Sequence, residues 1–94
     1  MSDFIPPRLS LPNGQEYVLS GQMTIGRAIE NAIKLDDGGS SRKHAAIEVA
    51  GARVILRDLG SSNGTWVNDQ RVAEPVELGD GDLIRISGTT MIFY

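Results

Sequence analysis

The sequence predicts an all-β fold, either a sandwich or a barrel, from three observations. Short runs of alternating apolar and polar residues recur along the whole chain, and such runs are typical of half-buried strands. Clusters of Gly, Pro, Asn, Asp and Ser separate these runs at close spacing, as turns do. Only residues 27–35 have apolar side chains at helical spacing. About ten short strands joined by turns are therefore expected, which favours a sandwich or barrel.

Turn residues divide the chain into these strands. Pro12-Asn13-Gly14 and Ser20-Gly21 each combine residues that favour tight turns. Pro75 cannot donate a hydrogen bond to a ladder, so the segment around it is expected at a sheet edge. The last two strands form a hairpin across Ser87-Gly88-Thr89. The expected strand segments are residues 8–11, 15–19, 23–25, 32–35, 45–49, 53–57, 65–67, 71–72, 74–78, 83–86 and 90–94.

The segment from Arg27 to Leu35 allows two interpretations. Its apolar residues have the spacing of one helical face, so taken alone it could form two turns of helix. Gly26 and the cluster Asp36-Asp37-Gly38-Gly39 bracket it closely, however, and such short helices are marginal in water. We expect a loop that contains a short strand near Ala32–Leu35.

Composition excludes several classes of protein. The 94 residues suffice for one small domain. The chain has no cysteine, which excludes a disulfide framework and a thiolate metal site. No apolar run approaches the about 20 residues of a membrane-spanning helix, and the N-terminal residues lack the features of a signal peptide. We expect a cytoplasmic protein without a membrane partner.

Charge and motifs exclude further partners. The formal net charge of −3 argues against a general nucleic-acid binder, which needs a basic face. It is compatible with one local cationic pocket. Asp80 and Asp82 lack the spacing of a calcium-binding EF-hand, and no glycine turn ends as a nucleotide-binding P-loop does. We expect no metal and no cofactor.

One long polar turn lies between two of the expected strands. It runs from Asp58 to Asn68, and it contains Gly60 and Gly64, which can adopt positive φ without a Cβ penalty. The pair Asn63-Gly64 alone would indicate a simple hairpin. The polar run is longer than a hairpin needs, and loops held between strands often carry binding groups.

Three loops together offer donors for an anion. Gly26-Arg27, Ser41-Arg42-Lys43-His44 and Ser62-Asn63-Gly64 each lie beside an expected strand. They supply guanidinium, hydroxyl and amide groups with almost no acid among them. An arginine fork and neutral N–H or O–H donors are the groups that bind phosphate well.

The order of these motifs resembles the forkhead-associated (FHA) domain. Gly26-Arg27 comes first, then Ser41-Arg42-x-His44, then the run from Asp58 to Asn68. The tail Leu78-x-x-Gly81-Asp82-x-Ile84-x-Ile86 is similar to the closing hairpin of that family. The resemblance covers about residues 20–94. It indicates a single FHA-like domain over residues 1–94, of which residues 1–7 are a candidate disordered segment.

The resemblance implies an eleven-stranded antiparallel β-sandwich of the FHA type that recognises phosphothreonine peptides. The partner would be a phosphothreonine-containing protein or peptide, the substrate of a Ser/Thr kinase. A phosphothreonine carries about −1.5 to −2 charges and three acceptor oxygens. The positions that the resemblance assigns to phosphopeptide binding are Arg27, Ser41, Arg42, Ser62 and Asn63. The positions that it assigns to shaping the loops are Gly26, His44, Gly64 and Asn68.

Two other functions are open from the residues alone. A phosphate-independent assembly domain could dimerise through a sheet face or edge, with Met91-Ile92-Phe93-Tyr94 as a candidate surface. A hydrolase could use Ser41 and His44, which are three residues apart. No nucleophile-elbow pattern accompanies them, so we expect no catalytic residue and a structural His44. The sequence does not indicate an oligomeric state.

The resemblance also bears on selectivity. Some FHA domains read an acidic residue three places after the phosphothreonine with a basic side chain two residues before the position of Ser41. Here that position is Gly39, so no strong acidic preference is expected there. Selectivity is expected from the Ser87-Gly88-Thr89 and Asp69-Gln70 turns instead.

Overall fold

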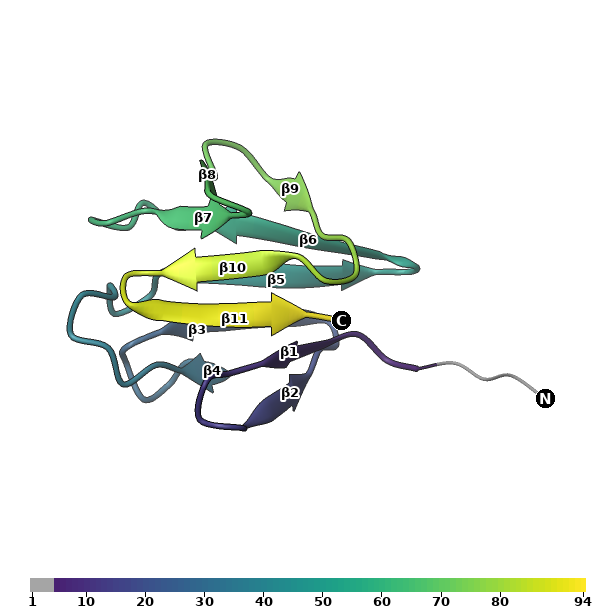
Figure 1. Cartoon of the computed structure of the whole chain (residues 1–94), viewed down its shortest axis with the longest axis horizontal. Helices are drawn as coiled ribbons and strands as arrows, with labels where there is room; N and C mark the ends of the chain where they lie inside the picture. The colour runs from purple at the N-terminus through teal and green to yellow at the C-terminus, as the bar shows by residue number, and fades with distance from the viewer. Residues whose placement is uncertain (1–4) are drawn as a thin grey trace.

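The computed structural model describes residues 5–94, which form two β-sheets packed face to face (Figure 1). These residues contain eleven strands, and no helix among them is long and apolar enough to cross a membrane. The predicted eleven-stranded sandwich is confirmed. Of the candidate disordered segment, residues 1–4 lie outside the described residues. The Pro7 carbonyl accepts a hydrogen bond from the Leu19 N–H at 2.8 Å.

Both sheets mix neighbours from distant parts of the sequence. The six-stranded sheet has the order β2 (Glu16–Val18), β1 (Arg8–Ser10), β11 (Thr89–Phe93), β10 (Leu83–Ile86), β7 (Thr65–Val67) and β8 (Gln70–Arg71). The five-stranded sheet has the order β4 (Ile33–Lys34), β3 (Gln22–Gly26), β5 (Ala45–Ala50), β6 (Arg53–Asp58) and β9 (Val76–Glu77). All strand pairs are antiparallel except β3 and β4, which are parallel, so the expected antiparallel pairing fails at this one place.

The core lies between the sheets and follows the alternation of the strands. In the six-stranded sheet Ile84 and Met91 are paired in register, and both are fully buried. In the five-stranded sheet Ile47 and Leu56 are paired and equally buried. Their burial is the main stabilising contribution, because apolar surface is removed from water.

The C-terminal strand is a core element. Strand β11 lies between β1 and β10, and its Met91 and Phe93 point into the core. Only Ile92 and Tyr94 of the segment proposed as an assembly surface remain partly accessible. The segment as a whole is therefore not a free apolar surface, because strand alternation sends every second side chain inward.

The segment after β3 is a loop with a short strand, as predicted. Residues 27–32 are turns and bends, and β4 follows. Ala28 is buried, whereas Ile29 has 82% of its surface exposed, so the apolar residues do not share one helical face. The Leu35 N–H donates to the Gly26 carbonyl at 2.8 Å, which closes the loop at its base.

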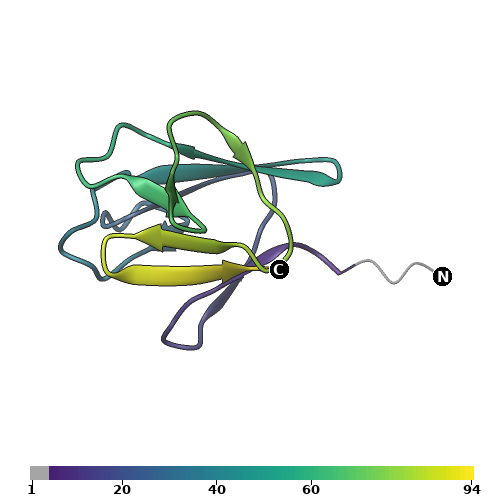
Figure 2. The same ribbon diagram turned by 45° about the horizontal axis from the view of Figure 1, so that its top comes forward.

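Four connections meet at one end of the sandwich, on the left in Figures 1 and 2. They are the loops β3–β4, β4–β5 and β6–β7 and the turn β10–β11. The start of β1 and the end of β11 lie at the other end. There the Arg8 N–H donates to the Tyr94 carbonyl at 3.1 Å, and the Tyr94 N–H donates to the Arg8 carbonyl at 2.9 Å. Function is therefore sought at the loop end.

Met91 and Ile92 provide a matched test of this packing. We expect Met91→Ala to lower the free energy of unfolding by about 2–5 kcal/mol, because a fully buried side chain leaves a cavity. Ile92→Ala, on the outer face, should cost about 1 kcal/mol or less. Urea denaturation of both variants measures the difference. Equal losses would contradict the assignment of faces.

Candidate anion-binding site

The β3–β4 loop is hydrogen-bonded along the β4–β5 loop. The Arg27 N–H donates to the Ser41 carbonyl at 3.0 Å, and the Ala28 N–H donates to the Arg42 carbonyl at 3.1 Å. The Arg27 side chain is exposed, and its Nε donates to the Ser40 carbonyl at 3.2 Å. This bond restricts the orientation of the guanidinium.

Gly26 and Asn31 permit this close approach. A Cβ on Gly26 would overlap the Arg42 carbonyl oxygen. Asn31 is buried, and its Nδ2 donates to the carbonyls of Ala28 at 2.8 Å and Arg42 at 2.6 Å. Its Oδ1 has no hydrogen-bond partner within residues 5–94. Asn31 therefore acts as a cross-link between the two loops that carry Arg27 and Arg42.

His44 connects the two sheets at the loop end. It is fully buried. Its Nδ1 accepts a hydrogen bond from the Ser41 N–H at 2.9 Å, and its Nε2 lies 2.8 Å from the Gly64 carbonyl. Only an unprotonated Nδ1 can accept from an N–H, so Nε2 carries the hydrogen and donates it to Gly64. His44 is thus hydrogen-bonded to both the Ser41 loop and the β6–β7 loop.

The same geometry removes the Ser41–His44 pair as a nucleophile and base. Both ring nitrogens are bonded to backbone groups. The Ser41 Oγ accepts a hydrogen bond from the Ser62 N–H at 3.2 Å and not from the imidazole. A general base needs a free lone pair within reach of the nucleophile, and His44 has none.

Two further contacts join the β4–β5 and β6–β7 loops. Beside the bond between Ser62 and Ser41, the Asn63 Nδ2 donates to the Gly39 carbonyl at 2.6 Å. The side chains of Ser62 and Asn63 are exposed. The structure therefore brings together all five residues expected to contact a phosphopeptide: Arg27, Ser41, Arg42, Ser62 and Asn63.

Asp58 shapes the β6–β7 loop from inside. Its Oδ2 accepts from the N–H groups of Gly60 and Ser61, at 2.9 and 3.0 Å. Its Oδ1 accepts from the hydroxyls of Ser61 and Thr65, at 2.5 and 2.7 Å. Burial raises the pKa of Asp58, but the hydrogen bonds from Ser61, Thr65 and Gly60 outweigh burial and lower the pKa below its usual value.

Asp37 has the same role in the β4–β5 loop. Its carboxylate accepts from the Gly39 N–H at 2.9 Å, and across the sandwich from the Gly88 N–H and the Thr89 hydroxyl at 2.9 and 2.8 Å. The hydrogen bond from Gly39, with those from Thr89, Ser87 and Gly88, lowers the pKa of Asp37. A Cβ on Gly39 would overlap the Ser87 hydroxyl, so this position is packed against the β10–β11 turn.

The remaining charges at the loop end are mostly positive. The exposed Asp36 of the β4–β5 loop is paired with Lys34 at 2.5 Å. Arg27, Arg42 and Lys43 are exposed, and among these three only Arg42 has an ion pair within residues 5–94, with Glu30 at 4.0 Å. Both side chains of that pair are well exposed, so the attraction is weak and easily displaced. Because Asp37 and Asp58 are engaged by local donors, the surface presents donors and cations to solvent. This arrangement suits an anion.

One residue and one turn that the sequence analysis associated with the binding loops lie away from this end of the sandwich. Asn68 does order a turn, since its Nδ2 donates to Asp82 at 2.9 Å and its Oδ1 accepts from the Leu83 N–H at 3.0 Å. That turn, however, lies at the start of β10, away from Ser87. The Asp69-Gln70 turn is there too, on the side of β7 away from the Ser87 turn, and its expected contribution to selectivity stays a prediction. Sequence spacing does not reveal which end of a sheet a turn occupies.

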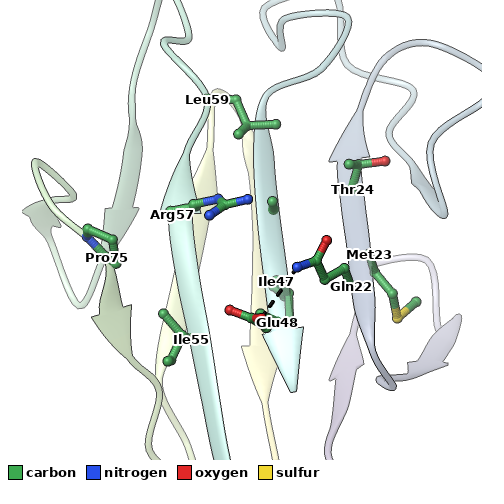
Figure 3. Close-up of a pocket in the computed structure, with 10 residues that line it drawn as sticks. Gln22, Met23, Thr24, Ile47, Glu48, Ile55, Arg57, Leu59 and Pro75 are labelled. Carbon is green, nitrogen blue, oxygen red and sulfur yellow. Dashed lines mark hydrogen bonds between the residues drawn. The ribbon is translucent and has the colours of Figure 1, made fainter. Parts of the chain in front are cut away.

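A shallow groove on the outer face of the five-stranded sheet is a different feature (Figure 3). It lies over Ala46, whose small side chain leaves a hollow, and Thr24, Leu59 and Pro75 are among its lining residues. Its Gln22 Nε2 donates to Glu48 at 3.3 Å. The groove contains none of the five residues expected to contact a phosphopeptide, so it is separate from the candidate anion site.

The residues that sequence reasoning missed are Asn31, Asp37 and Asp58. Each accepts or donates bonds to loop backbone rather than to a ligand. Asp58 precedes Gly60-Ser61, and Asp37 precedes Gly38-Gly39. An aspartate just before Gly or Ser is a signal for such local capping, and it could have identified both. Asn31 had no comparable signal.

Comparison with known proteins agrees with this geometry. The model of the FHA domain family matches residues 23–87, which is more than half of the chain. The chain belongs to the FHA domain family. Among curated relatives, the transcriptional regulatory protein EmbR of Mycobacterium tuberculosis is 43% identical over 77 residues, 81% of this chain and 20% of EmbR. The FHA domain-containing protein FhaA of the same organism is 41% identical over 81 residues, 85% of this chain and 15% of FhaA.

Solved FHA domains have the same fold. A structure from a study of phosphothreonine-dependent FHA domain interactions superposes with a TM-score of 0.89, at 37% identity and 95% coverage of both chains. Mycobacterium tuberculosis EmbR in complex with a low-affinity phosphopeptide superposes with a TM-score of 0.88, at 38% identity, over 93% of this chain and 24% of that one. This FHA domain spans a fifth or less of the length of EmbR and FhaA.

The first prediction for this FHA domain concerns His44. His44→Ala leaves the buried Ser41 N–H and Gly64 carbonyl without their partner, so we expect a loss of about 1–3 kcal/mol in the free energy of unfolding. Lys43→Ala, at the exposed neighbouring position, is the matched control and should unfold like wild type. Urea denaturation measures both. A His44→Ala variant as stable as wild type would show that the imidazole bonds are not structural.

A second prediction concerns Asp58 and pH. A lowered folded-state pKa contributes stability that is complete above the unfolded pKa, about 3.9, and is lost as pH falls through the folded value. Asp58→Asn should therefore reduce stability by about 1–3 kcal/mol at neutral pH and flatten the acid side of the stability curve. Thermal melts from pH 7 to pH 2 test this, with the exposed Asp80→Asn as control. Parallel curves for wild type and Asp58→Asn would refute it.

Proposed function

We propose that this FHA domain binds a phosphothreonine-containing segment of another protein, the product of a Ser/Thr kinase, and performs no catalysis itself. The observation that carries the proposal is the convergence of Arg27, Ser41, Arg42, Ser62 and Asn63 at one end of the sandwich, around a Ser41 loop held by His44. Solved relatives with this fold were studied for phosphothreonine dependence or with a phosphopeptide.

Arg27 is suited to grip the phosphate. Its Nε is held by the Ser40 carbonyl at 3.2 Å, and the terminal nitrogens are the part of the fork left for a ligand. A planar, pre-oriented guanidinium matches phosphate oxygens better than an ammonium does. Arg42 is exposed on the adjoining loop and adds charge from a second direction.

Ser41 supplies a neutral donor. Its Oγ already accepts from the Ser62 N–H at 3.2 Å, so the hydroxyl hydrogen is free to turn toward a phosphate oxygen. The Ser62 side chain is exposed on the same loop surface. Neutral donors complete the shell of a dianion without adding charge that would have to be desolvated.

Asn63 is suited to hold the backbone of the partner. Its Nδ2 is fixed by the Gly39 carbonyl at 2.6 Å, and this bond leaves Oδ1 as an acceptor facing away from the loop. A peptide N–H next to the phosphothreonine is the natural donor. Recognition of a phosphothreonine made by a Ser/Thr kinase is expected in the cytoplasm, and it requires no cofactor.

Peptide titrations test the proposal. The probe is a pool of random-flank phosphothreonine peptides, followed by one selected peptide in unphosphorylated, phosphothreonine and phosphoserine forms. We expect the unphosphorylated form not to bind. The phosphoserine form should bind roughly fourfold more weakly, because one methyl group contributes about 0.8 kcal/mol. Equal binding with and without phosphate would favour an assembly domain instead.

Arg27 variants locate the phosphate. Arg27→Ala removes a charge-assisted contact worth about 1.5–3 kcal/mol, so affinity should fall roughly 10- to 150-fold. Arg27→Lys should recover only part of it. Both variants should melt close to wild type, because the side chain is exposed. Arg53→Ala, at the start of β6, is the control and should bind like wild type. Wild-type affinity in Arg27→Ala would exclude this site.

A further inference from the structure

Three side chains form a cluster on the outer face of the six-stranded sheet. Trp66 on β7 is paired in register with Arg85 on β10 and with Arg71 on β8. The Cζ atoms of Arg85 and Arg71 lie 4.9 and 6.0 Å from the centre of the Trp66 ring. Guanidinium groups at these distances are attracted to the aromatic ring. Because β7 lies between β10 and β8, Trp66 holds one cation from each neighbouring strand.

The cluster adjoins the candidate site. The Trp66 Nε1 is 3.4 Å from the Asn63 carbonyl oxygen, to which it donates. Arg71 covers Gly64, because a Cβ on that glycine would lie 2.9 Å from the Arg71 Nε. Asn63 and Gly64 are the residues that join the Ser41 loop through Gly39 and His44. A peptide seated on Asn63 therefore passes close to these arginines.

Neither arginine has an acidic partner. Within residues 5–94 the salt bridges of arginine involve Arg8, Arg42 and Arg53, and none involves Arg71 or Arg85. Arg27 and Arg57 also form none within these residues, so the shared contact with Trp66 is what distinguishes the cluster. The two guanidinium groups that share Trp66 therefore carry positive charge with no carboxylate paired to it, and an anion bound at the cluster would be attracted to both.

We propose that Arg71 and Arg85, presented on Trp66, form a second anion subsite that takes an acidic or phosphorylated side chain flanking the phosphothreonine in the same partner segment. The inference rests on the proposed function. Stacking on Trp66 restricts the two long side chains before binding, which lowers the entropy cost of ordering them. The subsite is exposed, so each contact should change affinity by roughly 2- to 5-fold and weaken as salt increases.

The test uses a phosphothreonine peptide with alanine flanks. In one series a single aspartate replaces each flanking position in turn, and in a second series a phosphoserine does so. For wild type, at least one flanking position should tighten binding by about 2- to 5-fold in low salt. A larger gain with phosphoserine identifies a phosphorylated partner residue, and an equal or smaller gain identifies a carboxylate.

Variants assign that gain to the cluster. The double variant Arg71→Gln with Arg85→Gln should bind the alanine-flanked peptide as wild type does but lose the gain from the added anion. Arg53→Gln removes the same kind of charge elsewhere and should keep the gain. Trp66→Leu should reduce the gain although both arginines remain. Trp66 is the single tryptophan of the chain, so its fluorescence should respond to the acidic peptide more than to the alanine-flanked one.

The inference is overturned if no flanking anion tightens binding to wild type, or if the double variant keeps the gain. Both outcomes leave phosphothreonine recognition intact. If the alanine-flanked phosphothreonine peptide itself does not bind wild type above its unphosphorylated form, the proposed function fails and the subsite fails with it. Thermal melts of each variant identify any loss that comes from unfolding.

Discussion

The two hydrogen bonds of the His44 imidazole are the contact on which the loop end of this sandwich depends. His44 lies just before β5 of the five-stranded sheet. Its Nε2 is hydrogen-bonded to the carbonyl of Gly64, which lies just before β7 of the six-stranded sheet. One rigid ring thus connects loops from both layers. It also requires an acceptor at one nitrogen and a donor at the other, which neutral imidazole provides in a planar frame. This connection fixes the positions of Ser41, Ser62 and Asn63.

An anion site that contains two aspartates needs an explanation, and the loops supply it. Asp37 and Asp58 each receive several hydrogen bonds from N–H and O–H groups of their own or neighbouring loops. Their charge is compensated locally, so the potential at the surface comes from Arg27, Arg42 and Lys43. The carboxylates organise loops that would otherwise leave backbone donors unpaired.

Much of this architecture follows from the sequence because strand alternation is a local property. The sequence correctly predicts a loop with a short strand over residues 27–35, because the flanking glycines and aspartates outweigh the helical spacing of the apolar residues. The local bond of Asp37 to Gly39 has a sequence signal, but its bonds to Gly88 and Thr89, 51 and 52 positions away, have none. The role of Asn31 could not be predicted for a similar reason, because its partner Arg42 is on another loop. The sequence also does not show at which end of the sandwich the turn at Asp69 lies, because that depends on how distant strands pair.

The reciprocal hydrogen bonds between Arg8 and Tyr94 have a consequence for how the domain is carried. Polypeptide attached at either residue leaves from one place, at the end of the sandwich opposite the β3–β4 and β6–β7 loops (Figure 1). The domain can therefore be inserted between other modules, or mounted at the tip of a tether, without its covalent neighbours obstructing the loops. Insertion of this kind is well tolerated where the two attachment points are adjacent.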